Sequence, residues 1–580
     1  MLFDYFCHWN GSDFPIKSLD MSNFFKENEQ LRRHFAHPWM REIVALREKE
    51  YTESEQFDNA PSNFEEAIEH YESSLALLGE ICANVIAPNA AKVDKAGSSL
   101  EDGQVTYAEG TAENHRALTE AALYGMSLPR CYNGLNFPAV AAIMATEMIA
   151  RADAAMVNIW SLQDCADTIN EFGDEDIKAY FLPRIAKGET CSMVLTEPTA
   201  GSDLQSIKMP ASWDEQAQVW RLNGVKRFIT NGDADIHLVL ARSEEGTTDA
   251  RGLSLFVYHK SWGGAKVRHI DNKIGLKGTP TCEVIFDNAP AKLIGSRRMG
   301  LIKYIFTLMN RARLGIGAQS VGISEAALRA AYKYATNRKQ FGLPIIKLPA
   351  VAEMLATMQT KLDASRALLY ETGRFVDLAN GYSIKAQSES LSAEERQRSK
   401  WAQRNADMLT PILKLISSEF CNQVTYDAIQ VFGGSGVLEE SPVARLYRDA
   451  RITTIYEGTS QLQVVAAAKY LSNGELATSI RERMATISEP VIAEQFSRLA
   501  DEFEQAISYC TERGSEYATF HQRRLVEMGG HIVMAHLLYT ERGCDARTEQ
   551  SFRHFLALAE AWSAERKSLI VNFAPLEFAQ

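Results

Sequence analysis

The spacing of apolar residues changes twice along this chain, and this change constrains the fold more than any other feature. From about Ser62 to Gly188, apolar residues recur every three or four positions, which is typical of amphipathic helices. From about Thr190 to Gly295 the period drops to two, which predicts strands. Helical spacing returns at Gly300 and continues through the rest of the chain. The sequence therefore predicts a mainly α protein with a central β-domain, in the order α–β–α, followed by a C-terminal helical extension.

We expect the 580 residues to form several domains, since one domain usually takes about 100–200 residues. The changes in spacing predict an N-terminal extension, an α-helical domain, a middle β-domain, a four-helix-bundle domain and an additional helical domain, at residues 1–61, 62–188, 189–297, 298–472 and 473–580.

Several elements can be predicted inside these domains. The extension should contain short helices packed on the outside, and the bundle should contain long helices at 308–337, 349–380 and 401–432. In the β-domain, VWRLNGVKRFI predicts two strands joined by a tight hairpin at Asn223-Gly224.

Charge and composition exclude several classes of protein. A net charge of -13 argues against a nucleic-acid binder. The nine cysteines are scattered without a CxxC pair, which indicates thiols in a reducing cytoplasm rather than disulfides or a zinc site. No apolar run approaches the ~18 residues of a membrane span, so we expect no integral membrane association. Residues 1–20 have no secretory pattern, and Met21 is the more conventional start, so we interpret 1–20 as an over-long start.

Familiar hydrolase and nucleotide motifs are missing or weak. The chain has no P-loop, no HExxH and no pair of histidines at ligand spacing, so we expect no metal site. Gly433-Gly434-Ser435-Gly436 resembles a dinucleotide loop, but the next glycine and the surrounding βαβ unit are absent.

The strongest catalytic candidate is the turn Tyr456-Glu457-Gly458-Thr459-Ser460. It places a carboxylate on a glycine-containing turn directly before a helix that Thr459 or Ser460 can cap. A helix start carries free N–H groups and partial positive charge, which suit a phosphate or a polar cofactor edge. The alternative interpretation is a surface turn with a solvated glutamate.

Three other polar segments share this character. They are the Pro/Gly loop TEPTAGSD (196–203), the strand end FITNG (228–232) and the basic, aromatic helix end RKQFG (338–342). Each one alone also fits a structural role, as a turn, a strand end or a helix C-cap. Their combination and order point to a common function.

With these motifs the chain resembles the acyl-CoA dehydrogenase family over about residues 62–472. TEPTAGSD is similar to the family's flavin and substrate loop, FITNG to its second flavin strand, RKQFG to its inter-subunit cofactor clasp and IYEGTSQLQ to its catalytic segment. The block after residue 473 resembles a longer bacterial subgroup that includes 3-methylmercaptopropionyl-CoA dehydrogenases. The resemblance implies bound FAD, an acyl-CoA substrate, α,β-dehydrogenation to the trans-2-enoyl-CoA as in β-oxidation, an electron-transferring flavoprotein as acceptor, and a homo-oligomer, with a dimer favoured over a tetramer.

By the same resemblance, Glu457 is the base that removes the α-proton, and its backbone N–H helps to hold the thioester carbonyl. Burial beside an apolar acyl chain should raise the pKa of Glu457. The implied cofactor-binding residues are Leu195, Thr196, Ser202, Phe228, Thr230, Arg338, Phe341, Gln430, Gly433, Gly434, Thr459 and Gln461. The implied substrate-binding residues are Ser202, Asn310, Arg313, Tyr456 and Gly458.

Some positions depart from the family pattern. Phe228 stands where a tryptophan is common, and Leu348-Pro349 replaces a polar pair that often serves the adenine. Branched-chain members can carry the base on the earlier helix, but that place holds Asn310, Arg311 and Ala312, which supports Glu457.

Two related functions remain as alternatives. An acyl-CoA oxidase would pass its electrons to oxygen. A non-catalytic, DNA-associated flavoprotein would carry a basic terminal domain, whereas the block after residue 473 is acidic.

Overall fold

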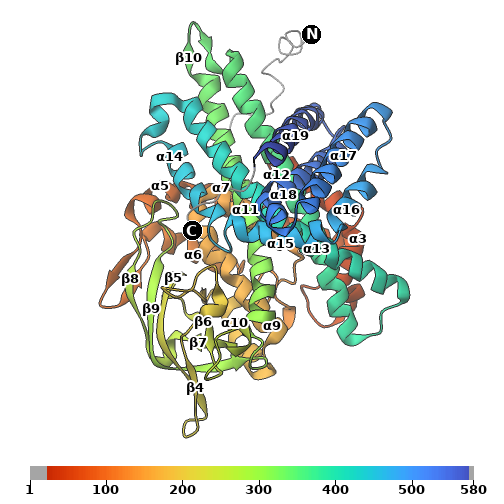
Figure 1. The fold of residues 1–580 in the computed structure, drawn as a ribbon. Coiled ribbons are helices and arrows are strands. Elements are labelled where there is room, and N and C mark those ends of the chain that lie inside the picture. The colour runs from red at the N-terminus through yellow and green to blue at the C-terminus, as the bar shows by residue number, and fades with distance from the viewer. Residues whose placement is uncertain (1–22, 574–580) are drawn as a thin grey trace.

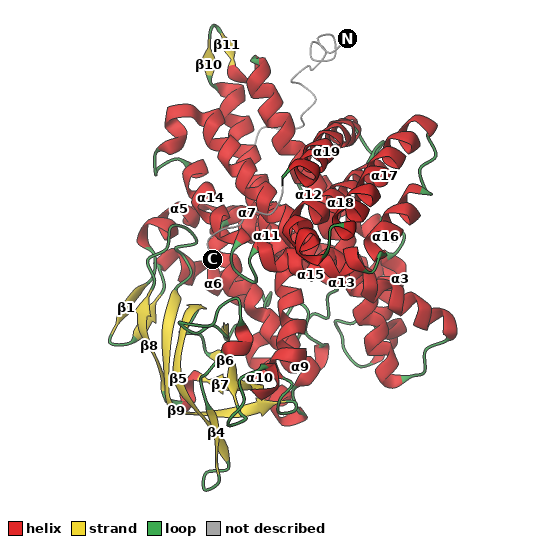
Figure 2. Ribbon diagram, viewed as in Figure 1, coloured by secondary structure: helices red, strands yellow, loops and turns green. Residues whose placement is uncertain are grey.

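The computed structural model describes residues 23–573, so the interpretation of residues 1–20 lies outside the described residues. Figure 1 shows the β-sheet on one side of the molecule, long helices through its centre, and the C-terminal helices on the side away from the sheet. Figure 2 shows that helices make up most of the chain and that the strands gather in one region, apart from a small hairpin at the top of the view. The predicted α–β–α order with a helical extension is confirmed.

The helical region before the sheet begins with α4 (Phe64–Ile81), whose N-cap Asn63 accepts a hydrogen bond from the backbone of Glu66. A π-helical turn at Cys82–Ile86 continues α4 directly into the next helix. Asp153 and Asp174 cap two later helices in the same way, as expected of short polar side chains at helix starts. The other helices are α5 (Ala87–Ala96), α6 (Glu109–Glu120), α7 (Ala139–Ala152), α8 (Ala154–Trp160), α9 (Asp164–Phe172) and α10 (Glu175–Ala186).

The central sheet has seven strands in the order β3-β6-β7-β9-β5-β4, with β8 paired to β9. Its strands are β3 (Cys191–Val194), β4 (Ala211–Asp214), β5 (Val219–Thr230), β6 (Ile236–Arg242), β7 (Leu253–His259), β8 (Ala265–Ile270) and β9 (Thr281–Ile294). Two short hairpins lie outside it, β1 (Ser99–Glu101) with β2 (Gln104–Thr106), and β10 (Lys339–Gln340) with β11 (Leu343–Pro344).

The hairpin predicted at Asn223-Gly224 is wrong. β5 runs unbroken from Val219 to Thr230, and its pairing with β9 shifts register between Leu222 and Gly224. A β-bulge therefore takes the place of the turn, because the partner strand continues on both sides of it.

The three predicted long helices of the bundle are present, and two of them are clearly longer than predicted. They are α11 (Phe306–Asn337), α12 (Pro349–Ser388) and α13 (Ala393–Phe432), followed by α14 (Pro442–Ala450) and α15 (Ser460–Ser472). Ser392 and Glu395 form a capping box that starts α13. Small residues on α11 allow close packing, since a Cβ at Gly322 would lie 2.4 Å from the backbone oxygen of Glu147.

The additional domain consists of α16 (Glu475–Met484), α17 (Pro490–Glu512), α18 (Ser515–Glu541) and α19 (Ala546–Asn572). Its buried phenylalanines, Phe496 and Phe503 among them, belong to the same apolar core as the bundle. At Gly530 the backbone of α18 comes so close to α13 that a Cβ would lie 2.4 Å from Ile416 Cδ1. The extra domain thus packs directly on the bundle.

The N-terminal extension, with α2 (Glu29–Arg33) and α3 (Met40–Arg47), is not simply on the outside, contrary to the prediction. Its Phe24, Met40 and Val44 are buried in the main core. Glu27 also forms an ion pair with Arg329 of α11. The described part of the extension, residues 23–61, is therefore part of the folded unit.

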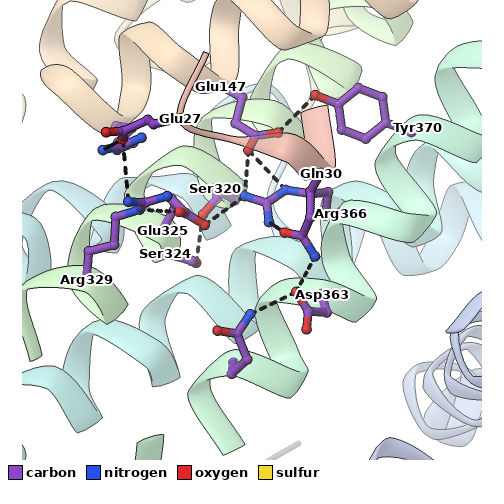
Figure 3. Close-up of polar contacts among 12 residues, drawn as sticks. Glu27, Gln30, Glu147, Ser320, Ser324, Glu325, Arg329, Asp363, Arg366 and Tyr370 are labelled. Atoms are coloured by element: carbon purple, nitrogen blue, oxygen red, sulfur yellow. Dashed lines mark hydrogen bonds and ion pairs between the residues drawn. The ribbon is translucent and has the colours of Figure 1, made fainter. Parts of the chain in front are cut away.

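A buried ion network joins α7, α11 and α12 (Figure 3). Arg366 donates to Glu147 at 2.6 Å and to Glu325 at 2.9 Å, and Tyr370 donates to Glu147 at 3.0 Å. Because these charges lie away from water, each depends on its partners. The network fixes α11, which contributes to the site described next, against α7 and α12.

Among the described residues, one helical stretch, Phe64–Ala96, has the length and hydropathy of a membrane span, contrary to the expectation that none would. One face of this stretch, with Ala67, Tyr71, Leu75 and Leu78, is buried in the core.

Candidate active site

The main candidate site is a cavity of about 740 Å³ between the β-domain and the bundle. This volume is within the usual range for small-molecule sites. The predicted base, Glu457, and several residues predicted to bind cofactor or substrate gather in its wall, namely Leu195, Thr196, Ser202, Phe228, Thr230, Tyr456, Gly458 and Thr459. Three segments far apart in the sequence therefore meet at one place.

Glu457 lies on a tight turn immediately before α15. Its φ of +55° is unusual for a residue with a side chain, and Gly458 follows with φ of +90°. Thr459 caps α15 by accepting a hydrogen bond from the backbone of Leu462, as the sequence predicted for Thr459 or Ser460. Such strained backbone persists only where surrounding contacts hold it.

The contacts that hold this turn come from two buried side chains. Lys414 Nζ and Gln463 Nε2 each donate to the backbone oxygen of Gly458 at 2.8 Å, and Gln463 also donates to that of Glu457 at 3.3 Å. Ser460 donates to Glu419, which also accepts from Arg523 of α18. The extra domain therefore contacts the segment that carries Glu457 through the hydrogen bond from Arg523 to Glu419.

The electrostatic environment suits a proton acceptor. Burial raises the pKa of Glu457, and the cations Lys414 and Arg313 partly offset that rise. Burial also lowers the pKa of Lys414 to about 7, although Glu457 acts in the opposite direction. A carboxyl with a raised pKa beside a cavity is typical of a general base.

Tyr456 fixes the turn from its other side. Its hydroxyl donates to Gln319 and, at 3.3 Å, to Asn158. Gln319 in turn donates to the backbone oxygen of Ala154 at 3.0 Å. The turn is thereby tied to α8 and α11.

The β-domain wall is shaped by a buried lysine. Lys226 Nζ donates to the backbone oxygens of Leu195 and Leu240, both at 2.8 Å, and to Glu197 at 3.1 Å. Glu197 also accepts from the backbones of Lys208 and Met209. These bonds fix the loop that presents Leu195 and Thr196 to the cavity.

The wall fits the flat ring of the flavin expected from the sequence. Phe228 sits at a bulge of β5 with φ of +59°, and 58% of its surface is exposed beside the cavity. Thr196 and Thr230 supply hydroxyls in the same wall. An exposed aromatic ring can stack on a planar heterocycle, and two hydroxyl groups beside it can form hydrogen bonds with the polar edge of that heterocycle.

Two of the predicted substrate residues lie beside the cavity but do not line it. The positive charge of Arg313 acts to lower the pKa of Glu457, and Arg313 donates a hydrogen bond to Asn310 at 3.0 Å. A Cβ on Gly458 would lie 3.6 Å from Arg313 Nη2, so the guanidinium is close to the turn.

The other residues predicted to bind the cofactor do not line this cavity within one chain. Phe341, at the tip of the β10–β11 hairpin, is 89% exposed. The remaining members of this set are also exposed, namely Arg338, Gln430, Gly433, Gly434 and Gln461. Their role at a subunit interface stays a prediction.

Sequence reasoning missed three polar residues of the site. Lys414 and Gln463 sit within apolar helices, where a single lysine or glutamine carries no distinguishing signal. Asp164, on α9, lines the cavity, and burial together with the charges of Asp167 and Glu457 raises its pKa to about 8.

Comparisons with known proteins agree over almost the whole chain. The chain matches the families described as acyl-CoA dehydrogenase N-terminal, middle and C-terminal domains over residues 69–189, 192–289 and 302–471. Residues 472–578 match the family described as acyl-CoA dehydrogenase C terminal.

Individual relatives agree with this. A 3-methylmercaptopropionyl-CoA dehydrogenase of Ruegeria pomeroyi is 33% identical over 67% of this chain and 68% of its own length. An acyl-CoA dehydrogenase of Bacillus subtilis is 35% identical over 61% of this chain and 87% of its own.

Solved structures show the same fold. Butyryl-CoA dehydrogenase of Megasphaera elsdenii has a TM-score of 0.59 at 28% identity, covering 69% of this chain and 98% of its own. An acyl-CoA dehydrogenase of Bacillus anthracis has a TM-score of 0.71 at 22% identity over 88% and 89%. The chain therefore belongs to the acyl-CoA dehydrogenase family and is an oxidoreductase that acts on the CH–CH bond of an acyl-CoA.

Proposed function

We propose that this protein oxidises an acyl-CoA to its trans-2-enoyl-CoA and that Glu457 is the base that removes the α-proton. One observation carries the proposal: a carboxylate with a raised pKa, held in a strained turn, faces the same cavity as the loop 195–202 and the strand end 228–230. The cofactor is FAD, which when bound supplies the acceptor for the hydride that leaves the β-carbon.

The chain's own residues account for the proton step. The α-proton of a thioester is weakly acidic, so the base must be held close to it while the carbonyl oxygen receives hydrogen bonds. Lys414 and Gln463 hold the turn, which fixes the carboxylate of Glu457 and leaves its backbone N–H as a donor for the thioester oxygen. The apolar share of the wall, with Leu162, Met193 and Met309, excludes water from the reacting carbons.

The exposed residues at the far end of the bundle suit a second subunit. Phe341 and Leu343 are exposed apolar side chains on one hairpin, with Arg338 at its base. We propose a homodimer in which this hairpin, with Gln430 and Gly433, meets the neighbour's FAD. A surface of large exposed apolar residues beside a cation is typical of an interface.

We further propose that an electron-transferring flavoprotein takes up the electrons and that the protein works in the cytoplasm. The eight cysteines within the described residues are all free, which supports a reducing compartment.

Anaerobic titration of the FAD-loaded protein with a panel of acyl-CoAs tests the proposed reaction. The flavin should lose its yellow absorbance with at least one acyl-CoA, and the enoyl-CoA should form in equal amount. An unchanged spectrum across the panel would contradict the proposal. Rapid reoxidation by air after reduction would favour an oxidase instead.

A further inference from the structure

A second cavity, of about 760 Å³, lies where the N-terminal extension, the bundle and the extra domain meet. Figure 1 shows α16, which contributes to it, on the side of the molecule away from the sheet; α18, which also contributes, packs against α12. None of the described residues lines both this cavity and the active-site cavity. The second cavity is thus a separate place in the fold.

Two arginines in its wall have unused hydrogen-bond donors. Arg374, on α12, is only 4% exposed, yet its Nε and Nη1 have no partner, and neither has Nε of Arg483 on α16. Both guanidinium groups share one carboxylate, Glu371, which accepts from Arg374 at 3.0 Å and from Arg483 at 3.2 Å. Buried N–H groups without acceptors are costly, so these donors call for a further acceptor.

The charges of this triad do not balance. Two cations face one carboxylate, and Arg483 and Arg374 lower the pKa of Glu371 although burial opposes them. Glu541 does not supply a full negative charge near pH 7, because burial raises its pKa to about 7 despite the nearby Arg374. The triad therefore keeps an excess of positive charge.

The other arginines of the cavity are already paired. Arg33 forms ion pairs with Glu29 and Asp545. Arg366 forms ion pairs with Glu147 and Glu325 in the network of Figure 3. Among the described arginines of this wall, Arg374 and Arg483 are the ones with buried N–H groups that lack a partner.

The histidines of the wall add no positive charge to the cavity near pH 7. Burial lowers the pKa of His37 and of His536 to about 4, and Arg374 and Arg483 respectively add to this effect. Burial and Arg374 also hold the pKa of His34 well below its usual value. All three are neutral near pH 7, and Nδ1 of His536 is a further polar atom without a partner.

Aromatic side chains form another part of the wall. Trp39, Phe375 and Trp401 contact one another, with ring centroids 4.8 to 5.4 Å apart. Leu537 adds an aliphatic surface. The rings stand at 57° to 80° to one another, so the cavity combines a cationic corner with an aromatic wall.

We propose that this second cavity binds a small organic anion, an oxyanion carried on an aromatic body, whose oxygens are held by Arg374 and Arg483. Guanidinium groups suit carboxylate and phosphate oxygens equally, since both accept paired hydrogen bonds. The ligand would join the extension, α12, α16 and α18, and so would stabilise the contact of the extra domain with the bundle.

Calorimetric titration of the full-length, FAD-loaded protein tests this with three probes. Phenyl phosphate and benzoate carry the two oxyanions on the same ring, and inorganic phosphate lacks the ring. We expect one site per chain, with at least one aromatic probe binding at least tenfold more tightly than inorganic phosphate. The tighter of the two aromatic probes identifies the oxyanion.

Arginine variants connect this binding to the cavity. Arg374→Gln and Arg483→Gln should each weaken binding at least tenfold without changing flavin reduction by acyl-CoA. Arg481→Gln is the matched control, because Arg481 lies on the same helix but pairs with Asp501 and Glu504, and it should leave binding unchanged. If Arg374→Gln does not fold, the less buried Arg483→Gln decides. Absence of binding by all three probes, or full affinity in Arg483→Gln, would overturn the proposal.

Discussion

Replacing Lys414 with methionine isolates the group that holds the catalytic turn. The change keeps the apolar stem of the side chain but removes the ammonium that donates to the backbone oxygen of Gly458 at 2.8 Å. Gln463 remains as the second donor to the same oxygen. The turn should therefore stay folded but be held less firmly in its strained geometry.

The size of the effect follows from the bond that is lost. A hydrogen bond from a charged group contributes about 1.5–3 kcal/mol. If all of it serves to hold Glu457 in its reactive position, flavin reduction should slow by about 10- to 100-fold, since about 1.4 kcal/mol corresponds to a factor of ten.

Lys414→Met should also change how the rate of flavin reduction depends on pH. Glu457 must be ionised to accept a proton, so the rate rises with pH through its pKa. Loss of the Lys414 cation removes an interaction that favours the ionised form, so this limb should move to higher pH. The pKa of Lys414 is lowered to about 7 by burial, so the difference from the wild type should be greatest below pH 7.

Anaerobic stopped-flow measurement of flavin bleaching across pH is the assay. Gln463→Leu is the matched control, because it removes a neutral donor from the same oxygen: its rate should fall while the pH limb stays in place. A Lys414→Met limb that stays in place or moves to lower pH would refute this reasoning.

Four further substitutions test other parts of the structure. Gly315→Ala, on helix α11, should raise Tm by the equivalent of about 0.5–1 kcal/mol, because the added Cβ would meet nothing within 4 Å. Gly322→Ala, on the same helix, should lower Tm by the equivalent of about 1–3 kcal/mol, because the added Cβ would lie 2.4 Å from a backbone oxygen. An equal response of the two in differential scanning calorimetry would contradict the packing described. Asp164→Leu should improve kcat/KM for unsubstituted acyl chains, because it removes a polar group from the cavity wall; a loss for every chain length in steady-state assays would show that Asp164 serves the reaction itself. Arg366→Met should destabilise the protein by about 3–5 kcal/mol, because it leaves Glu147 and Glu325 without their shared cation; chemical denaturation that shows no loss would contradict the network.

Much of the architecture could be predicted from local patterns. The long helices follow from the recurrence of apolar and small residues, and the cap of α15 follows from a threonine placed before an apolar run. These features depend on residues near one another in sequence. The sequence therefore predicted the turn that carries Glu457, and the structure places it at a cavity.

Features that depend on distant partners could not be predicted. Asn223-Gly224 is a strong hairpin signal, but pairing with β9 continues past it, so the strand bulges and does not turn. Lys226 and Lys414 resemble ordinary surface lysines in sequence, whereas the fold buries both and uses each to bind backbone oxygens. The sequence also gives no sign that the extra domain supports the catalytic segment through Arg523 and Glu419.

The most direct test of the account is an anaerobic acyl-CoA titration of Glu457→Gln. Glutamine keeps the shape of the side chain but cannot accept the α-proton. We expect this variant to retain FAD and to bind acyl-CoA, with no loss of the yellow flavin absorbance under conditions that bleach the wild type. Flavin reduction at the wild-type rate would show that another group removes the proton.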